Sequence, residues 1–116
     1  MNHLDKFYEE IANARKYHDE KNEGKSRGCA RRAAGFAINA AFAQRDIRVV
    51  DKNAMNLIKL LKTEPALPAA VHQALDDLVL RVTPEYDLPG KIDLISSAIT
   101  IADFLFPMET QTETPQ

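Results

Sequence analysis

Four cations at the start of an apolar stretch are the first candidate for binding chemistry in this chain. They are Lys25, Arg27, Arg31 and Arg32. A guanidinium presents paired N–H donors that match the oxygens of a phosphate, so the cluster predicts a contact with an anion or with RNA. The alternative is a solvated helix start whose cations pair with nearby acidic residues. The cluster has no interleaved aromatic residue on which a base could stack, and this favours the alternative.

His72 and Asp76 are the second candidate, because they stand four residues apart on one predicted helical face. A carboxylate at this spacing can orient an imidazole for acid–base chemistry or join it as a metal ligand. One histidine with one carboxylate falls short of a metal site, and His3 and His18 belong to a different predicted helix. We therefore expect a surface pair or a buried, hydrogen-bonded histidine, and neither a metal nor a cofactor.

The remaining motifs give no sign of catalysis. Phosphate-loop and dinucleotide glycine patterns are absent from the sequence. Cys29 lies among alanines with no histidine on its helical face, which indicates a core position. We expect no catalytic residues and no enzymatic activity.

Composition places the chain among ordinary globular proteins. Its 116 residues are 45% hydrophobic and 28% charged, with a formal net charge of −2. This net charge does not show the excess of positive charge that is typical of nucleic-acid-binding proteins. The single cysteine excludes an intramolecular disulfide and fits a reducing compartment. The beginning of the sequence lacks a signal-peptide pattern and no apolar run is long enough to span a bilayer, so we expect a cytoplasmic protein.

The segment Ala30–Ala43 must organise the fold, because after Arg32 its one polar side chain is Asn39. A helix that is apolar nearly all round belongs in the middle of a structure. Its alanines and Gly35 allow a neighbouring backbone to come close. Ile38 and Phe42 project from the other side and need cover, either from the same chain or from a second copy. We expect the second copy, which places a homodimer interface at Gly35, Ile38 and Phe42.

Apolar periodicity predicts five helices and no strands. The first runs from about Leu4 to Lys21, with Gly24 as its C-cap and Ser26 as the N-cap of the central helix, which ends near Arg45. The third helix follows Asp51 as its N-cap and ends near Lys62. The fourth helix has Pro68 in its first turn. The fifth helix spans about Lys91–Phe106. We therefore predict one all-α domain over residues 1–107, a five-helix antiparallel bundle around the small-residue-rich second helix, followed by a disordered tail over 108–116.

This layout resembles that of the HEPN domains. The resemblance is carried by the small-residue helix Ala30–Phe42, the short apolar helix around Leu57–Leu61 and the proline-containing turn Arg81-Val82-Thr83-Pro84-Glu85-Tyr86. HEPN domains are small bundles with two long antiparallel helices followed by shorter ones, and the likeness would cover Leu4–Phe106. Catalytic HEPN ribonucleases carry an arginine followed after four to six residues by a histidine. Arg81 is followed at those spacings by Tyr86, Asp87 and Leu88, so the resemblance implies a non-catalytic member that dimerises and binds partners.

Three hypotheses for the function follow, in decreasing order of support. The first is a non-enzymatic, homodimeric helical module that acts through protein partners. The second is an RNA- or nucleotide-binding protein that uses the basic cluster at the start of the second helix. The third is an enzyme with a cleft around His72 and Asp76.

Overall fold

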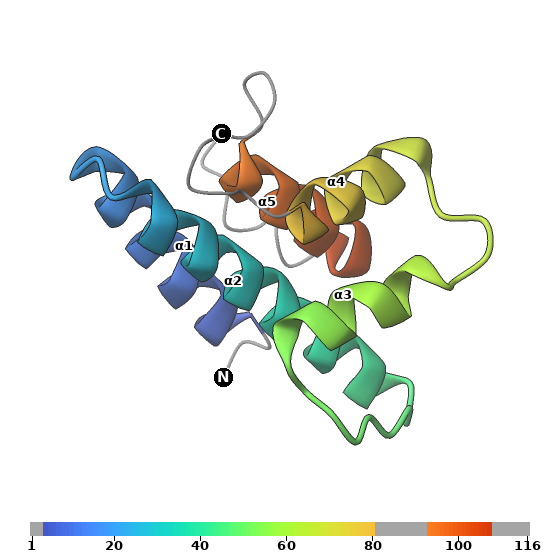
Figure 1. The fold of residues 1–116 in the computed structure, drawn as a ribbon. Helices are drawn as coiled ribbons and strands as arrows, with labels where there is room; N and C mark the ends of the chain where they lie inside the picture. The colour runs from blue at the N-terminus through green and yellow to red at the C-terminus, as the bar shows by residue number, and fades with distance from the viewer. Residues whose placement is uncertain (1–3, 81–92, 108–116) are drawn as a thin grey trace.

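Two long antiparallel helices form the base of the fold. The computed structural model describes residues 4–80 and 93–107 (Figure 1). Helix α1 spans Asp5–Asp19 and α2 spans Glu23–Gln44. Phe7, Ile11 and Ala14 are the buried residues of α1, at the spacing of three and four residues that predicts an amphipathic helix. The short connection over residues 20–22 makes the two helices antiparallel neighbours.

The turn between α1 and α2 is built without glycine. Lys21 takes the left-handed conformation, with φ of 61°. Its N–H donates to the His18 carbonyl oxygen at 3.0 Å, and the Asn22 N–H donates to that of Tyr17 at 2.8 Å. These two hydrogen bonds define a Schellman motif, which satisfies carbonyl groups at the end of α1.

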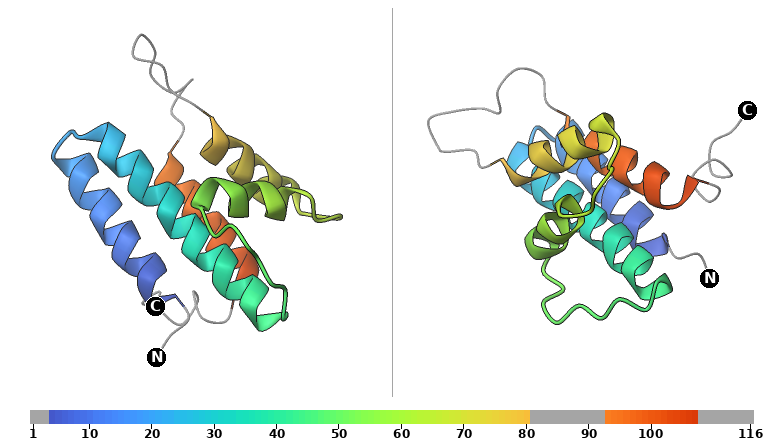
Figure 2. Two further views of the ribbon diagram at one scale, coloured as in Figure 1. Left: turned by 60° about the horizontal axis from the view of Figure 1, so that its bottom comes forward. Right: turned by 90° about the vertical axis from the view of Figure 1, so that its right-hand side faces the viewer.

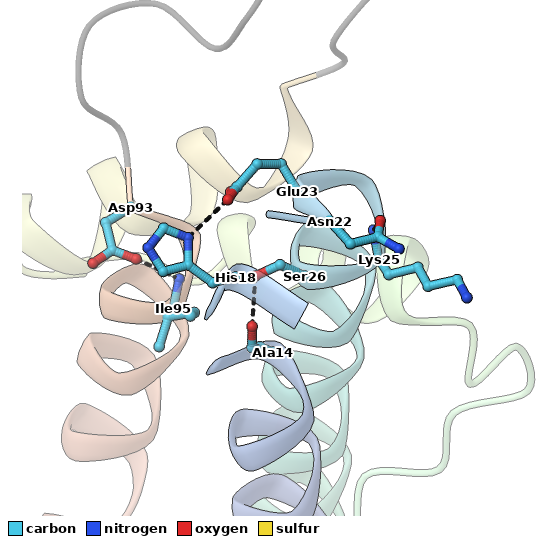
Figure 3. A network of polar contacts seen from close by, with 8 residues as sticks. All are labelled: Ala14, His18, Asn22, Glu23, Lys25, Ser26, Asp93 and Ile95. Carbon is cyan, nitrogen blue, oxygen red and sulfur yellow. Dashed lines mark hydrogen bonds and ion pairs between the residues drawn. The ribbon is translucent and has the colours of Figure 1, made fainter. Parts of the chain in front are cut away.

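Helix α2 begins earlier than its predicted cap. The Asn22 side chain accepts a hydrogen bond from the Lys25 N–H at 3.3 Å, and Gly24 lies within the first turn of α2. Ser26 is buried, and its hydroxyl donates to the Ala14 carbonyl oxygen of α1 at 2.8 Å (Figure 3). The predictions of Gly24 as the C-cap and Ser26 as the N-cap were therefore wrong.

Three shorter helices follow: α3 (Ala54–Lys62), α4 (Ala69–Val79) and α5 (Leu94–Leu105) (Figure 2). Asn53 caps α3 by accepting from the Met55 N–H at 2.9 Å. The predicted cap Asp51 instead accepts from the Asn53 N–H at 3.0 Å, so that prediction was wrong by two positions. The predicted start of the fifth helix at Lys91 lies outside the described residues. The tail over 108–116 also lies outside them, and its disorder stays a prediction.

Helix α2 lies at the centre of an all-α globule, as its composition predicts. Its residues Ala30, Ala33 and Ala37 have no exposed surface. Helix α1 packs against one side of α2, α5 and α3 pack against others, and α4 packs on α5 and α3 (Figures 1 and 2). Within the part of the chain that the structure describes, no helix is both long and apolar enough to cross a bilayer.

The side of α2 that carries Gly35, Ile38 and Phe42 is covered by the same chain. Ile38 has no exposed surface and Phe42 is 4% exposed. Helix α3 approaches Gly35 so closely that a Cβ there would lie 2.9 Å from the Ala54 Cβ. We expected a second copy to provide this cover, and the finding corrects that expectation. A homodimer, which stays a prediction, would have to use another surface.

Candidate functional site

Arg31, a member of the predicted basic cluster, holds the end of α4 against α2. Its Nε donates to the Leu78 carbonyl oxygen and its Nη2 to that of Leu80, each at 2.7 Å. The last carbonyl groups of a helix have no intrahelical donor, and a cation there also complements the helix dipole. Burial and the nearby charge of Arg27 lower the pKa of the Arg31 guanidinium, although an arginine remains charged in proteins.

Replacing Arg31 with alanine is expected to lower the free energy of unfolding by about 1.5 kcal/mol, because hydrogen bonds from a charged group contribute about that much. Lysine cannot span both carbonyl oxygens as a planar fork does, so Arg31→Lys should recover only part of the loss. Urea denaturation followed by circular dichroism measures both variants. Arg15→Ala, which removes an exposed cation from α1, is the control. Equal stabilities for all three variants would show that the two hydrogen bonds contribute nothing.

Arg32 is engaged by an acidic side chain of α1. Its Nε lies 2.7 Å from Glu10 Oε2, and its Nη2 donates to Cys29 Sγ at 3.2 Å. Burial acts to raise the pKa of Glu10, but hydrogen bonds from Arg32 and Asn13 bring it below its usual value. The same ion pair raises the pKa of Arg32. Cys29 is buried as predicted, and burial raises the pKa of its thiol.

The two remaining cations of the cluster differ from these. The Lys25 ammonium lies over the Tyr17 ring, 5.4 Å from its centroid. Arg27 is half-buried and forms no hydrogen bond or ion pair with the described residues. The structure therefore divides the predicted cluster. Arg31 and Arg32 have hydrogen-bonded partners, Lys25 rests on an aromatic ring, and Arg27 has neither kind of partner among the described residues.

A pair of glycines beside these cations was not recognised from the sequence. Gly24 and Gly28 lie one helical turn apart on α2. Apart from its chain neighbours and the backbone of α2 itself, no described atom lies within 4 Å of a Cβ built at Gly24, and a Cβ at Gly28 would contact only Arg32 Nη1, at 3.6 Å. The four-residue spacing of the two glycines could have shown that they share one helical face. It was missed because Gly24 was assigned to the end of the first helix.

Alanine at either glycine is expected to stabilise the fold by up to about 1 kcal/mol, because glycine is the weaker helix former and neither position lacks room. The gain should be larger at Gly28 than at Gly24, which lies in the less ordered first turn. Thermal unfolding of Gly24→Ala and Gly28→Ala against the parent chain measures the change. A loss of stability in either variant would show that the glycine at that position is required by the fold itself.

His72 and Asp76 form the surface pair that was predicted as one alternative. His72 Nδ1 lies 3.3 Å from Asp76 Oδ2, and Lys62 Nζ of α3 lies 2.6 Å from Asp76 Oδ1. The hydrogen bond from Lys62, more than the contact with His72, lowers the pKa of Asp76. Asp76 and both of its partners, Lys62 and His72, are partly exposed to water, so the trio links α3 to α4 weakly. Within residues 4–80 and 93–107, no three potential ligands gather at a metal-binding distance.

Comparison with protein-family models finds no match, and neither the curated proteins nor the solved structures include a chain that matches this one. The findings support an all-helical five-helix arrangement for the described residues without assigning it to a family.

Proposed function

We propose that the chain is a non-enzymatic helical module that forms a homodimer and acts through protein partners. The observation that carries this proposal is the incomplete cover of α5. Phe104 is 41% exposed, and Ile95, Ile99 and Leu105 are only partly buried against the core. Large apolar side chains left at a surface favour association, because burial removes their area from water.

The resemblance to non-catalytic HEPN domains supports the same proposal. Their long antiparallel pair followed by shorter helices matches the order α1 to α5. The turn that begins at Arg81, where a catalytic histidine would be expected in that family, lies outside the described residues. The proposal therefore draws on the layout of the helices and on the sequence that follows Arg81.

Light scattering coupled to size-exclusion chromatography tests the homodimer. At roughly 50 μM protein we expect twice the chain mass of 13.0 kDa. Phe104→Lys should shift the equilibrium to the monomer, because a charge would enter an apolar interface. Val50→Lys is the matched control, since Val50 is 99% exposed in the α2–α3 connection. A monomer in the parent chain, or equal dimerisation by both variants, would contradict the homodimer.

RNA or nucleotide binding by the basic cluster is the second candidate. The donors of Arg27, which have no partner among the described residues, favour it, whereas the ion pair of Arg32 with Glu10 reduces the charge that the cluster can offer. A salt-dependent mobility shift with RNA that is lost in Arg27→Glu would support this function. No shift at low salt would exclude it.

A further inference from the structure

Arg27 and Arg31 are two neighbouring guanidiniums without a carboxylate partner among the described residues. They stand four residues apart, so their side chains leave the same face of α2. Both are half-buried. Arg31 donates to carbonyl oxygens through Nε and Nη2, which leaves its other N–H groups available, and Arg27 keeps all of its donors. Half-buried cations of like charge at this spacing repel each other, and an acidic group placed between them would relieve that repulsion.

The surface beside this pair is open to a close approach. Gly24 and Gly28 run alongside the two arginines, and no described side chain other than that of Arg32 comes near a Cβ at either position. The internal packing accounts for Gly35, which faces Ala54, but it does not account for these two glycines. In Figure 1 the first turns of α2 extend beyond α3, and the end of α4 reaches only the edge of this face, where Arg31 donates to the Leu78 and Leu80 carbonyl oxygens.

We propose that this face of α2 docks an acidic helix of a partner protein. Arg27 and Arg31 provide the cations of the face, and Gly24 and Gly28 provide the surface that the docked helix would contact. Carboxylates one turn apart on the incoming helix would meet the two guanidiniums, which are also one turn apart. The glycines would let the two helix backbones approach closely. This inference rests on the proposed role in protein association and names the chemistry of the partner.

The charges around the face favour a short acidic helix over a nucleic acid. Glu10 already neutralises Arg32, and Glu23 stands at the start of the same helix beside His18 (Figure 3). The chain as a whole carries a net charge of −2, which opposes the approach of a long polyanion. Tyr17, whose ring lies beneath the Lys25 ammonium, is half-buried, so a base would not find this ring open.

A fluorescent alanine-rich helical peptide is the probe. One version carries pairs of glutamates at positions i and i+4, and the control replaces each glutamate with glutamine. Anisotropy with the full chain should show binding of the acidic peptide alone, and amide resonances of Gly24 and Gly28 should shift. Gly28→Leu should weaken binding by about tenfold, because its side chain would hold the peptide away. Arg27→Gln should weaken binding by about fivefold, and Arg15→Gln should leave it unchanged.

Four results would overturn the proposal. One is equal affinity for Gly28→Leu and the parent chain, with folding of the variant verified by circular dichroism. Another is tighter binding, at the same amides, of a single-stranded RNA of equal charge. The third is a loss of the dimer in Arg27→Gln, which would identify a second copy as the occupant. An absence of peptide binding in a chain that remains dimeric would refute this docking face alone. Peptide binding by a monomeric chain would refute the homodimer and leave the docking face standing.

Discussion

Replacing Ile38 with alanine is expected to lower the free energy of unfolding by about 3 kcal/mol, because the change leaves a cavity in a packed core. Ile38 has no exposed surface and is among the largest fully buried side chains of the described chain. Since α2 is surrounded by other helices of the same chain, the loss should be the same at low and high protein concentration. Urea denaturation at two concentrations tenfold apart provides the measurement.

This experiment separates the two ways in which Ile38 could have been covered. If a second copy supplied the cover, the stability lost by Ile38→Ala would depend on protein concentration, because association is coupled to folding. Val50→Ala is the matched control, since Val50 is 99% exposed and its truncation should change stability by less than about 0.5 kcal/mol. A loss below about 1 kcal/mol for Ile38→Ala would contradict the burial of this residue within one chain.

The helices were predictable because their signals are local. Phe7, Ile11 and Ala14 repeat at helical spacing in α1, and Leu57, Ile58 and Leu61 do so in α3. Each set is buried, since only one face of a surface helix can meet the core. The central position of α2 followed from the same reasoning, because a helix without a polar face has nowhere else to lie.

The helix ends were less predictable because more than one residue type can adopt the geometry of a cap. The left-handed positions after α1 and α2 are occupied by Lys21 and Asp46, with φ of 61° and 57°. Glycine is the residue expected there, since its backbone adopts positive φ without strain. The C-cap glycine was therefore predicted at Gly24, whereas Lys21 occupies the left-handed position at the end of α1.

The basic cluster shows what sequence reasoning cannot provide. Arg31 meets carbonyl oxygens that lie 47 and 49 residues further along the chain, and Arg32 meets a carboxylate 22 residues before it. Such partners depend on how helices pack, which periodicity within one helix does not specify. The sequence identified the cations, and the structure shows that Arg32 is the member of the cluster that pairs with a carboxylate among the described residues, whereas Lys25, Arg27 and Arg31 do not.

The Gly35→Ala variant should be destabilised by about 2 kcal/mol even though alanine is the better helix former. Alanine would gain about 1 kcal/mol of helix propensity. Its Cβ, however, would lie 2.9 Å from the Ala54 Cβ and 3.0 Å from the Ala54 Cα. The second atom belongs to the backbone at the start of α3, so relief of the clash requires a shift of that helix. Overpacking costs about 1–3 kcal/mol. A clash with the backbone belongs at the upper end, about 3 kcal/mol, which leaves a net loss of about 2 kcal/mol after the gain in propensity.

A double-mutant cycle with Ala54→Gly tests whether the contact itself is responsible for the loss. Removing the Ala54 side chain eliminates the closer clash, so Gly35→Ala should cost at least about 1 kcal/mol less in the Ala54→Gly background. Gly28→Ala, on the open face of the same helix, should gain stability, because a Cβ there meets no clash. Comparing it with Gly35→Ala therefore separates the effect of helix propensity from the effect of packing. If Gly35→Ala also gained stability, α3 would not approach α2 at this point.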